Sequence, residues 1–127
     1  MQMQLTAWVT IASLVVYIWM MINVGRARGK FNVKAPEMNG PPEFMSAVRV
    51  QGNTVEQMPI FLPALWMCAL FLGDLWAAAG GVLWIVGRVL YALGYYKDPS
   101  KRMLGFAVTT TANYALLIGT AVGLLTN

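Results

Sequence analysis

The hydrophobic positions of the chain fall into four long runs that are separated by polar segments. These runs cover residues 5–24, 58–72, 75–93 and 103–125. A lone strand in lipid leaves its backbone N–H and C=O groups unpaired, so each run is predicted to be a membrane-crossing helix. With their flanking turns, the predicted helices cover about residues 3–25, 45–73, 75–96 and 102–125.

The lengths of the connections predict an up-and-down antiparallel four-helix bundle. Gly73-Asp74 leaves so little chain that the second and third helices must form a tight hairpin. The only long connection precedes the second helix, and its proline-rich stretch "APEMNGPPEF" (35–44) is predicted to be irregular. No segment is left for a separate soluble core, so residues 1–127 are predicted to form one transmembrane domain.

Composition supports an all-α integral membrane protein. Hydrophobic residues make up 58% of the chain and charged residues only 11%, which is too little charge for the surface of a soluble domain of this size. Histidine is absent and Cys68 is the only cysteine. The usual ligands for zinc, haem and iron–sulfur clusters are therefore missing, so no metal is expected, and an intrachain disulfide is excluded.

The basic residues predict how the helices are oriented. Eight of the nine lysines and arginines lie in the connections 26–49 and 97–102, and Arg88 is the exception. Basic connections stay in the cytoplasm, so both termini are predicted on the opposite side. We expect a bacterial inner membrane, with the endoplasmic reticulum as the alternative.

A polar stripe extends the second helix toward the cytoplasm. The 15 residues of 58–72 span roughly 22 Å as a helix, less than the ~30 Å hydrocarbon core. The helix must therefore begin earlier, which draws Asn53 and Glu56 into the membrane and leaves Arg49 near the interface. At 3.6 residues per turn these three side chains project within about 60° of one another.

A second stripe is predicted at the same depth on the third helix. Arg88, Tyr91 and Tyr95 have the spacing i, i+3, i+7, and Arg102 opens the fourth helix on that side. The two stripes and Arg102 supply guanidiniums, a carboxylate, an amide and phenols. Such a cluster suits a small zwitterion that carries more than one carboxylate.

Structural interpretations of the same residues remain open at this point. Arg49 and Arg102 can be snorkelling interface residues, and the tyrosines can form an aromatic belt. Glu56 can form a purely structural ion pair with an arginine. Charged residues inside a membrane are nevertheless functional candidates by default, and the shared face and depth favour a site. Thr109 to Thr111 and Asn113 are interpreted as interhelical hydrogen-bonding residues.

Three motifs together resemble the MAPEG family, the membrane-associated proteins in eicosanoid and glutathione metabolism. They are "GPPEF" (40–44), "RVQGNTVEQMP" (49–59) and "GRVLYALGYYKDPSKR" (87–102). The resemblance covers essentially the whole chain and is nearest the branch of leukotriene C4 synthase and microsomal glutathione transferase 2.

The resemblance implies a homotrimer that binds glutathione between neighbouring subunits near the cytoplasmic face. It implies Arg102 as the residue that activates the glutathione thiol. Two departures from the synthase pattern stand out, since Gly29 follows Arg28 where the synthase has a second arginine, and Gln57 replaces an aromatic residue. The implied glutathione contacts are Arg28, Arg49, Gln51, Asn53, Glu56, Gln57, Tyr91 and Tyr95. Arg88 is expected to pair a glutathione carboxylate or to hold Glu56.

The expected activity is conjugation of the glutathione thiolate to a hydrophobic electrophile that arrives from the bilayer. A peroxidase or isomerase would need the same activated thiol and stays an alternative within the enzyme class. The second alternative is a non-catalytic lipid-binding or scaffold protein of the same fold. A small multidrug exporter is disfavoured because residues 5–24 contain no carboxylate for proton exchange.

Overall fold

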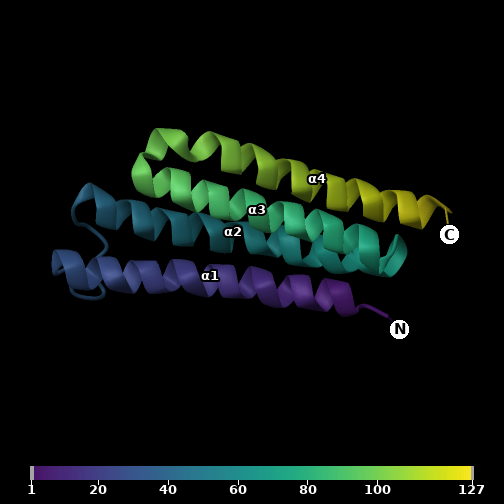
Figure 1. Cartoon of the computed structure of the whole chain (residues 1–127), viewed down its shortest axis with the longest axis horizontal. Helices are drawn as coiled ribbons and strands as arrows, with labels where there is room; N and C mark the ends of the chain where they lie inside the picture. Colours follow the sequence, from purple (N-terminus) through teal and green to yellow (C-terminus); the bar gives the residue numbers. More distant parts are fainter. Residues whose placement is uncertain (1, 127) are drawn as a thin grey trace.

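The computed structural model describes residues 2–126, which form an up-and-down bundle of four long helices (Figure 1). Each is long and apolar enough to cross a membrane, so the predicted all-α membrane bundle is confirmed. Both ends of the chain lie at the same end of the bundle (Figure 1). The elements are α1 (Gln4–Phe31), α2 (Pro42–Phe71), α3 (Asp74–Lys97), the 3₁₀ turn η1 (Pro99–Arg102) and α4 (Met103–Thr126).

The first helix is longer than predicted. It continues to Phe31, so Arg26, Arg28 and Lys30 lie on α1 and not in a connection. Arginine, lysine and alanine are good helix formers, and they continue the helix after the apolar run has ended. The helix stops at Asn32, which adopts a left-handed conformation (φ 58°), while the Val33 N–H bonds back to the Arg28 carbonyl.

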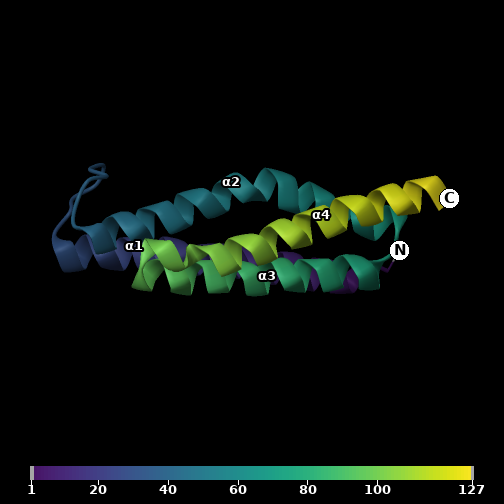
Figure 2. The same cartoon turned by 90° about the horizontal axis from the view of Figure 1, so that it is seen from above.

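The second helix also begins earlier than predicted, at Pro42, and places Arg49 within its second turn. Proline suits the first turn of a helix because its missing N–H has no partner there. Pro59 and Pro63 lie inside the helix without ending it. Figure 2 shows α2 bowed along its length, as expected where proline removes backbone hydrogen bonds.

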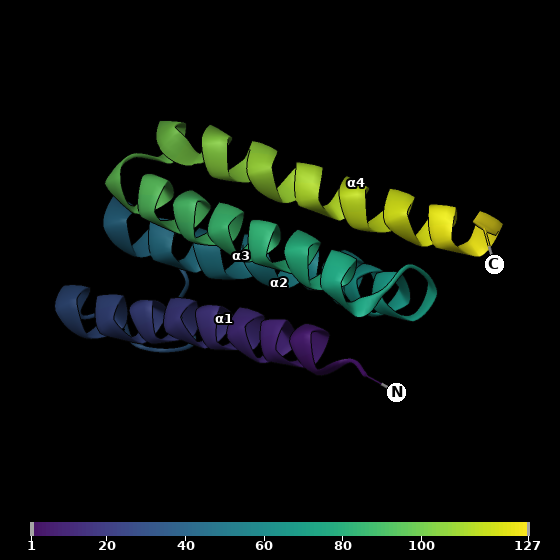
Figure 3. The same cartoon turned by 45° about the vertical axis from the view of Figure 1, so that its right-hand side comes forward.

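A carboxylate holds the start of α1 against the start of α3. Asp74 accepts hydrogen bonds from the backbone N–H groups of Leu5 (3.1 Å) and Thr6 (2.8 Å) and from the Thr6 hydroxyl (2.6 Å). Asp74 is also the first residue of α3. The Asp74 carboxylate therefore faces the positive N-terminal ends of two helices. It lies where the start of α1 comes near the α2–α3 turn (Figures 1 and 3).

Glycine allows α3 and α4 to approach closely beside the predicted site. A Cβ atom at Gly105 would lie 2.2 Å from the Tyr91 backbone nitrogen. A Cβ at Gly87 would lie 2.8 Å from the Thr109 nitrogen. Any side chain at these positions would push α4 away from Arg88 and Tyr91. The spacing of the two helices therefore depends on residues that contribute no side chain.

Candidate functional site

A buried arginine is the centre of the site. Arg88 is only 1% exposed. Its Nε donates to the Thr54 hydroxyl (2.9 Å), one terminal nitrogen donates to the Thr109 hydroxyl (3.4 Å), and the guanidinium carbon lies 3.8 Å from the centre of the Tyr91 ring. Within residues 2–126 no carboxylate lies at ion-pair distance from it. A buried cation without a counter-charge is costly, so this position calls for an anion.

A polar cavity of about 400 Å³ opens beside this guanidinium. The Asn53 amide donates to the Tyr91 hydroxyl (2.7 Å), which connects α2 to α3 across one wall. The cavity combines two guanidiniums with one carboxylate, two amides and a phenol. Its lining residues are Asn53, Glu56, Gln57, Arg88, Tyr91, Arg102 and Phe106.

Arg102 reaches the cavity from the turn that precedes α4. It ends η1, and its guanidinium donates to the Pro99 carbonyl (2.7 Å). The turn begins at Asp98, whose carboxylate accepts from the Ser100 N–H (3.0 Å), and this hydrogen bond holds the pKa of Asp98 below its usual value. Arg102 is exposed, whereas Arg88 is buried. The cavity thus has one guanidinium in its wall and another in contact with solvent.

Four of the predicted glutathione contacts lie outside this cavity. Arg49 is exposed on α2, and Tyr95 is buried with its ring 5.6 Å from that of Tyr91. The Gln51 amide donates to the Tyr17 hydroxyl (2.5 Å). Arg28 donates to the Glu37 carbonyl (2.7 Å) and lies over the Phe44 ring. A single chain therefore brings together only part of the predicted set.

The structural ion pair that was an alternative interpretation of Glu56 is not formed among the described residues. Glu56 is exposed and lines the cavity, and among the described residues its carboxylate is not paired with Arg88 or Arg49. Its charge is therefore available to a ligand in the cavity.

Comparison with known proteins places the chain in a family. The model of the MAPEG family matches residues 6–122, nearly the whole chain. The chain belongs to the MAPEG family.

Curated relatives of the chain match most of its length. An uncharacterised protein of Synechocystis is 41% identical over 119 residues, which are 94% of this chain and 87% of that protein. Human microsomal glutathione S-transferase 2 is 38% identical over 83% of this chain and 71% of its own length. Mouse leukotriene C4 synthase is 32% identical over 98% and 83%, respectively. The resemblance predicted from the motifs is thereby confirmed.

The sequence predicted only hydrogen bonds between helices for Thr109 and Asn113 of this MAPEG chain, and it did not single out Thr54. Thr54 and Thr109 hold the Arg88 guanidinium, and Asn113 donates to the Gln57 side-chain carbonyl (2.8 Å). Phe106, Thr109 and Asn113 have the spacing i, i+3, i+7 and share one face of α4. This spacing, on a helix that follows the one bearing Arg88, was the sequence signal that could have indicated that α4 contributes to the site.

Proposed function

We propose that this protein is a membrane-bound glutathione transferase that conjugates the glutathione thiolate to a hydrophobic electrophile. The observation that carries the proposal is the Arg88 guanidinium, which is buried in the wall of a polar cavity without a carboxylate partner among residues 2–126. A negatively charged ligand supplies the missing counter-charge. The names of the human and mouse relatives, a glutathione transferase and a leukotriene C4 synthase, support glutathione as that ligand.

The charges of the cavity match those of glutathione, which has two carboxylates, one ammonium and two peptide groups. We assign one carboxylate to Arg88 and the ammonium to Glu56. Asn53, Gln57 and Tyr91 supply groups that hydrogen bond to the peptide. Ionised partners in a desolvated site form the strongest hydrogen bonds, so the tripeptide is held by its ends.

Arg102 then acts on the sulfur. A peptide thiol has a pKa near ~8.5, and a nearby guanidinium stabilises only the thiolate. Lowering the pKa by about two units requires ~2.7 kcal/mol of differential interaction, which one close arginine can supply. The thiol proton passes to solvent, and the thiolate forms a C–S bond to the electrophilic carbon. At the same carbon the bond to the leaving group breaks, and its electron pair leaves with that group. In an epoxide the carbon–oxygen bond breaks instead, and its electron pair goes to the oxygen.

Three of the four remaining predicted contacts require a second subunit in this proposal. Arg28, Gln51 and Arg49 lie away from the cavity of their own chain, and in a homotrimer they would approach the cavity of a neighbour. The exposed apolar surface of the helices is large enough to provide subunit contacts and still face lipid.

The electrophile would enter from the bilayer. The site would face the cytoplasm of a bacterial cell, on the side opposite the termini.

The decisive test is turnover by the purified protein in detergent. We expect glutathione binding and conjugation of an aryl halide, measured by the absorbance of the thioether. Glutathione binding without turnover of aryl halides, epoxides or organic hydroperoxides would support the non-catalytic alternative. Consumption of a hydroperoxide with formation of glutathione disulfide, and no thioether, would favour a peroxidase.

A further inference from the structure

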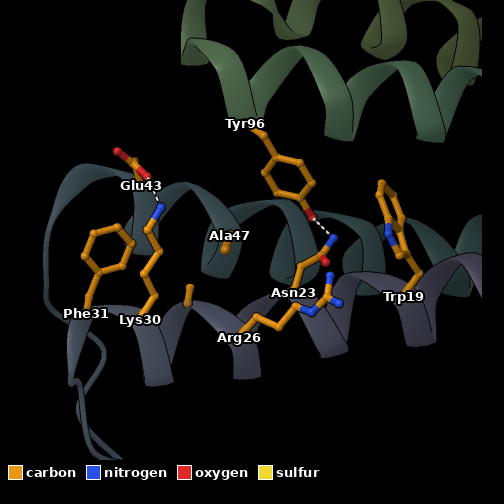
Figure 4. A pocket seen from close by; sticks show the side chains of 9 residues that line it. Trp19, Asn23, Arg26, Lys30, Phe31, Glu43, Ala47 and Tyr96 are labelled. Carbon is orange, nitrogen blue, oxygen red and sulfur yellow. Dashed lines mark hydrogen bonds and ion pairs between the residues drawn. The ribbon is translucent and has the colours of Figure 1, made fainter.

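A second cavity lies between α1, the start of α2 and the end of α3, outside the proposed glutathione site. It has a volume of about 370 Å³. The side chains of α1 project into it toward Tyr96 of α3 and Glu43 of α2 (Figure 4). Aromatic and aliphatic groups line the cavity together with the polar groups of Asn23, Arg26, Lys30, Glu43 and Tyr96. This mixture suits an amphiphile.

The length of α1 places this cavity at the membrane surface. Its 28 residues span about 42 Å, roughly 12 Å more than the hydrocarbon core. The other end of α1 lies at the Asp74 carboxylate, which must stay near the opposite interface. The hydrocarbon therefore ends near Asn23. Arg26 and Lys30 lie at the level of the lipid headgroups.

The polar groups of the cavity retain hydrogen-bonding capacity for a phosphate. Asn23 donates to the Tyr96 oxygen (3.1 Å), which leaves the Tyr96 O–H free to donate. Within residues 2–126 Arg26 makes no hydrogen bond or ion pair, and Trp19 packs edge-on against Tyr96. Lys30 pairs with Glu43 at 3.5 Å, but both side chains are 69% exposed, so the pair is weak. The two basic residues and Glu43 leave one net positive charge.

We propose that this cavity binds the headgroup of a monoanionic phospholipid from the leaflet at the basic end of the bundle. Arg26 pairs with the phosphate, the Tyr96 hydroxyl donates to it, and Trp19 lies along the glycerol and the first acyl carbons. Basic pockets between membrane helices bind anionic headgroups on the cytoplasmic side in the same way.

The cavity is separate from the proposed glutathione site. At 3.6 residues per turn, Trp19, Asn23, Arg26 and Lys30 project from α1 within about 60° of one another, whereas Arg28 points to the opposite side of the helix. None of the residues that the structure describes lines both cavities. Lipid binding is therefore expected to be independent of glutathione.

Native mass spectrometry of the full-length protein in detergent tests the proposal. The protein is titrated with phosphatidylglycerol or phosphatidylcholine of identical acyl chains, and the lipid-bound fraction is measured. We expect phosphatidylglycerol to bind at least about fivefold more tightly. Arg26→Gln is expected to reduce its binding about fivefold, the effect of one basic residue at an anionic bilayer surface. Arg26→Lys is expected to restore most of the loss.

Two further variants distinguish specific lipid binding in the cavity from non-specific attraction of the lipid by nearby basic residues. Lys34→Gln removes the same charge at the same end of the bundle, outside the cavity, and is expected to leave binding unchanged. Tyr96→Phe removes only a hydroxyl and is expected to weaken phosphatidylglycerol binding about threefold. Equal binding of both lipids, or equal losses in Arg26→Gln and Lys34→Gln, would overturn the proposal. Dissociation of the oligomer in Arg26→Gln, with lipid retained, would assign the cavity to a subunit contact and overturn it as well.

Discussion

Asn113 of α4 donates a hydrogen bond from its side-chain nitrogen to the side-chain carbonyl of Gln57 on α2, over a distance of 2.8 Å. Asn113 is 6% exposed, and its own side-chain oxygen is buried without a partner within residues 2–126. Because the side-chain carbonyl of Gln57 accepts this hydrogen bond, the NH₂ group of Gln57 remains available to donate into the cavity. Asn113 therefore orients the Gln57 amide so that a ligand contacts its NH₂ group.

The first prediction concerns this positioning. Asn113→Leu keeps the volume of the side chain but lets the Gln57 amide rotate. We expect KM for glutathione to rise about five- to tenfold with kcat nearly unchanged, because one hydrogen bond in a desolvated site is worth about 1–1.5 kcal/mol. Steady-state kinetics with saturating electrophile measure this. Thr111→Val, an exposed position on the same helix, is the control. A fall in kcat without a change in KM would show that Asn113 does not act through ligand binding.

The second prediction separates ligand binding from stability at Arg88. Arg88→Met removes a buried, unpaired charge and leaves a side chain of similar length. We expect glutathione affinity to fall at least about tenfold, while the thermal stability of the ligand-free protein stays equal or rises, because a buried charge without a partner is costly. Calorimetric titration and thermal unfolding in detergent measure the two effects. A large loss of stability with glutathione affinity unchanged would mean that Arg88 is purely structural.

The third prediction concerns thiol activation. Arg102→Ala should keep glutathione affinity within about tenfold and lose most of the conjugating activity at pH 7, because the thiol returns toward its ordinary pKa near ~8.5. Activity should therefore recover as the pH is raised toward 9, more steeply than in the parent. The ultraviolet absorbance of the bound thiolate reports its fraction directly. Lys101→Ala, one residue away and outside the cavity, is the matched control. Equal activity in Arg102→Ala and the parent would remove Arg102 from the mechanism.

The fourth prediction tests the carboxylate that joins two helix starts. Asp74→Asn removes the charge and one acceptor from the bonds to Leu5 and Thr6. We expect a lower unfolding midpoint, because the variant weakens a helix cap and removes a charge that opposes two helix dipoles. Thermal unfolding in detergent measures it. Glu43→Gln makes the same chemical change in an exposed ion pair and is expected to cost less than about 0.5 kcal/mol. Similar losses in both variants would contradict a specific role for Asp74.

The fifth prediction compares two glycines. Gly105→Ala would place a methyl group 2.2 Å from the Tyr91 nitrogen, so α4 must move away from α3. We expect a loss of stability above ~2 kcal/mol and a loss of activity. Gly25→Ala, where the same methyl meets nothing within 4 Å, is expected to stabilise α1 by about 0.5–1 kcal/mol. The two unfolding midpoints should therefore shift in opposite directions, and a parallel shift would contradict the close packing of α3 and α4.

The sequence was sufficient to predict the four helices and the residues that share a face on each of them. The lengths of the apolar runs determined four membrane helices, and a period of 3.6 residues placed Asn53 and Glu56 on one face of α2 and Arg88 and Tyr91 on one face of α3. The helix ends were less accurate, because helix-forming residues such as Arg26 and Lys30 continued α1 beyond its apolar run.

Only the tertiary structure decided which faces meet. It placed Arg102 in the same cavity as Arg88, kept Arg49 and Gln51 out of that cavity, and gave Thr109 and Asn113 their partners on other helices. These contacts depend on how each helix is rotated about its own axis and on how closely α4 approaches α3 at Gly105. Rotation and approach result from the packing of all four helices together, so a periodicity within one helix cannot specify them.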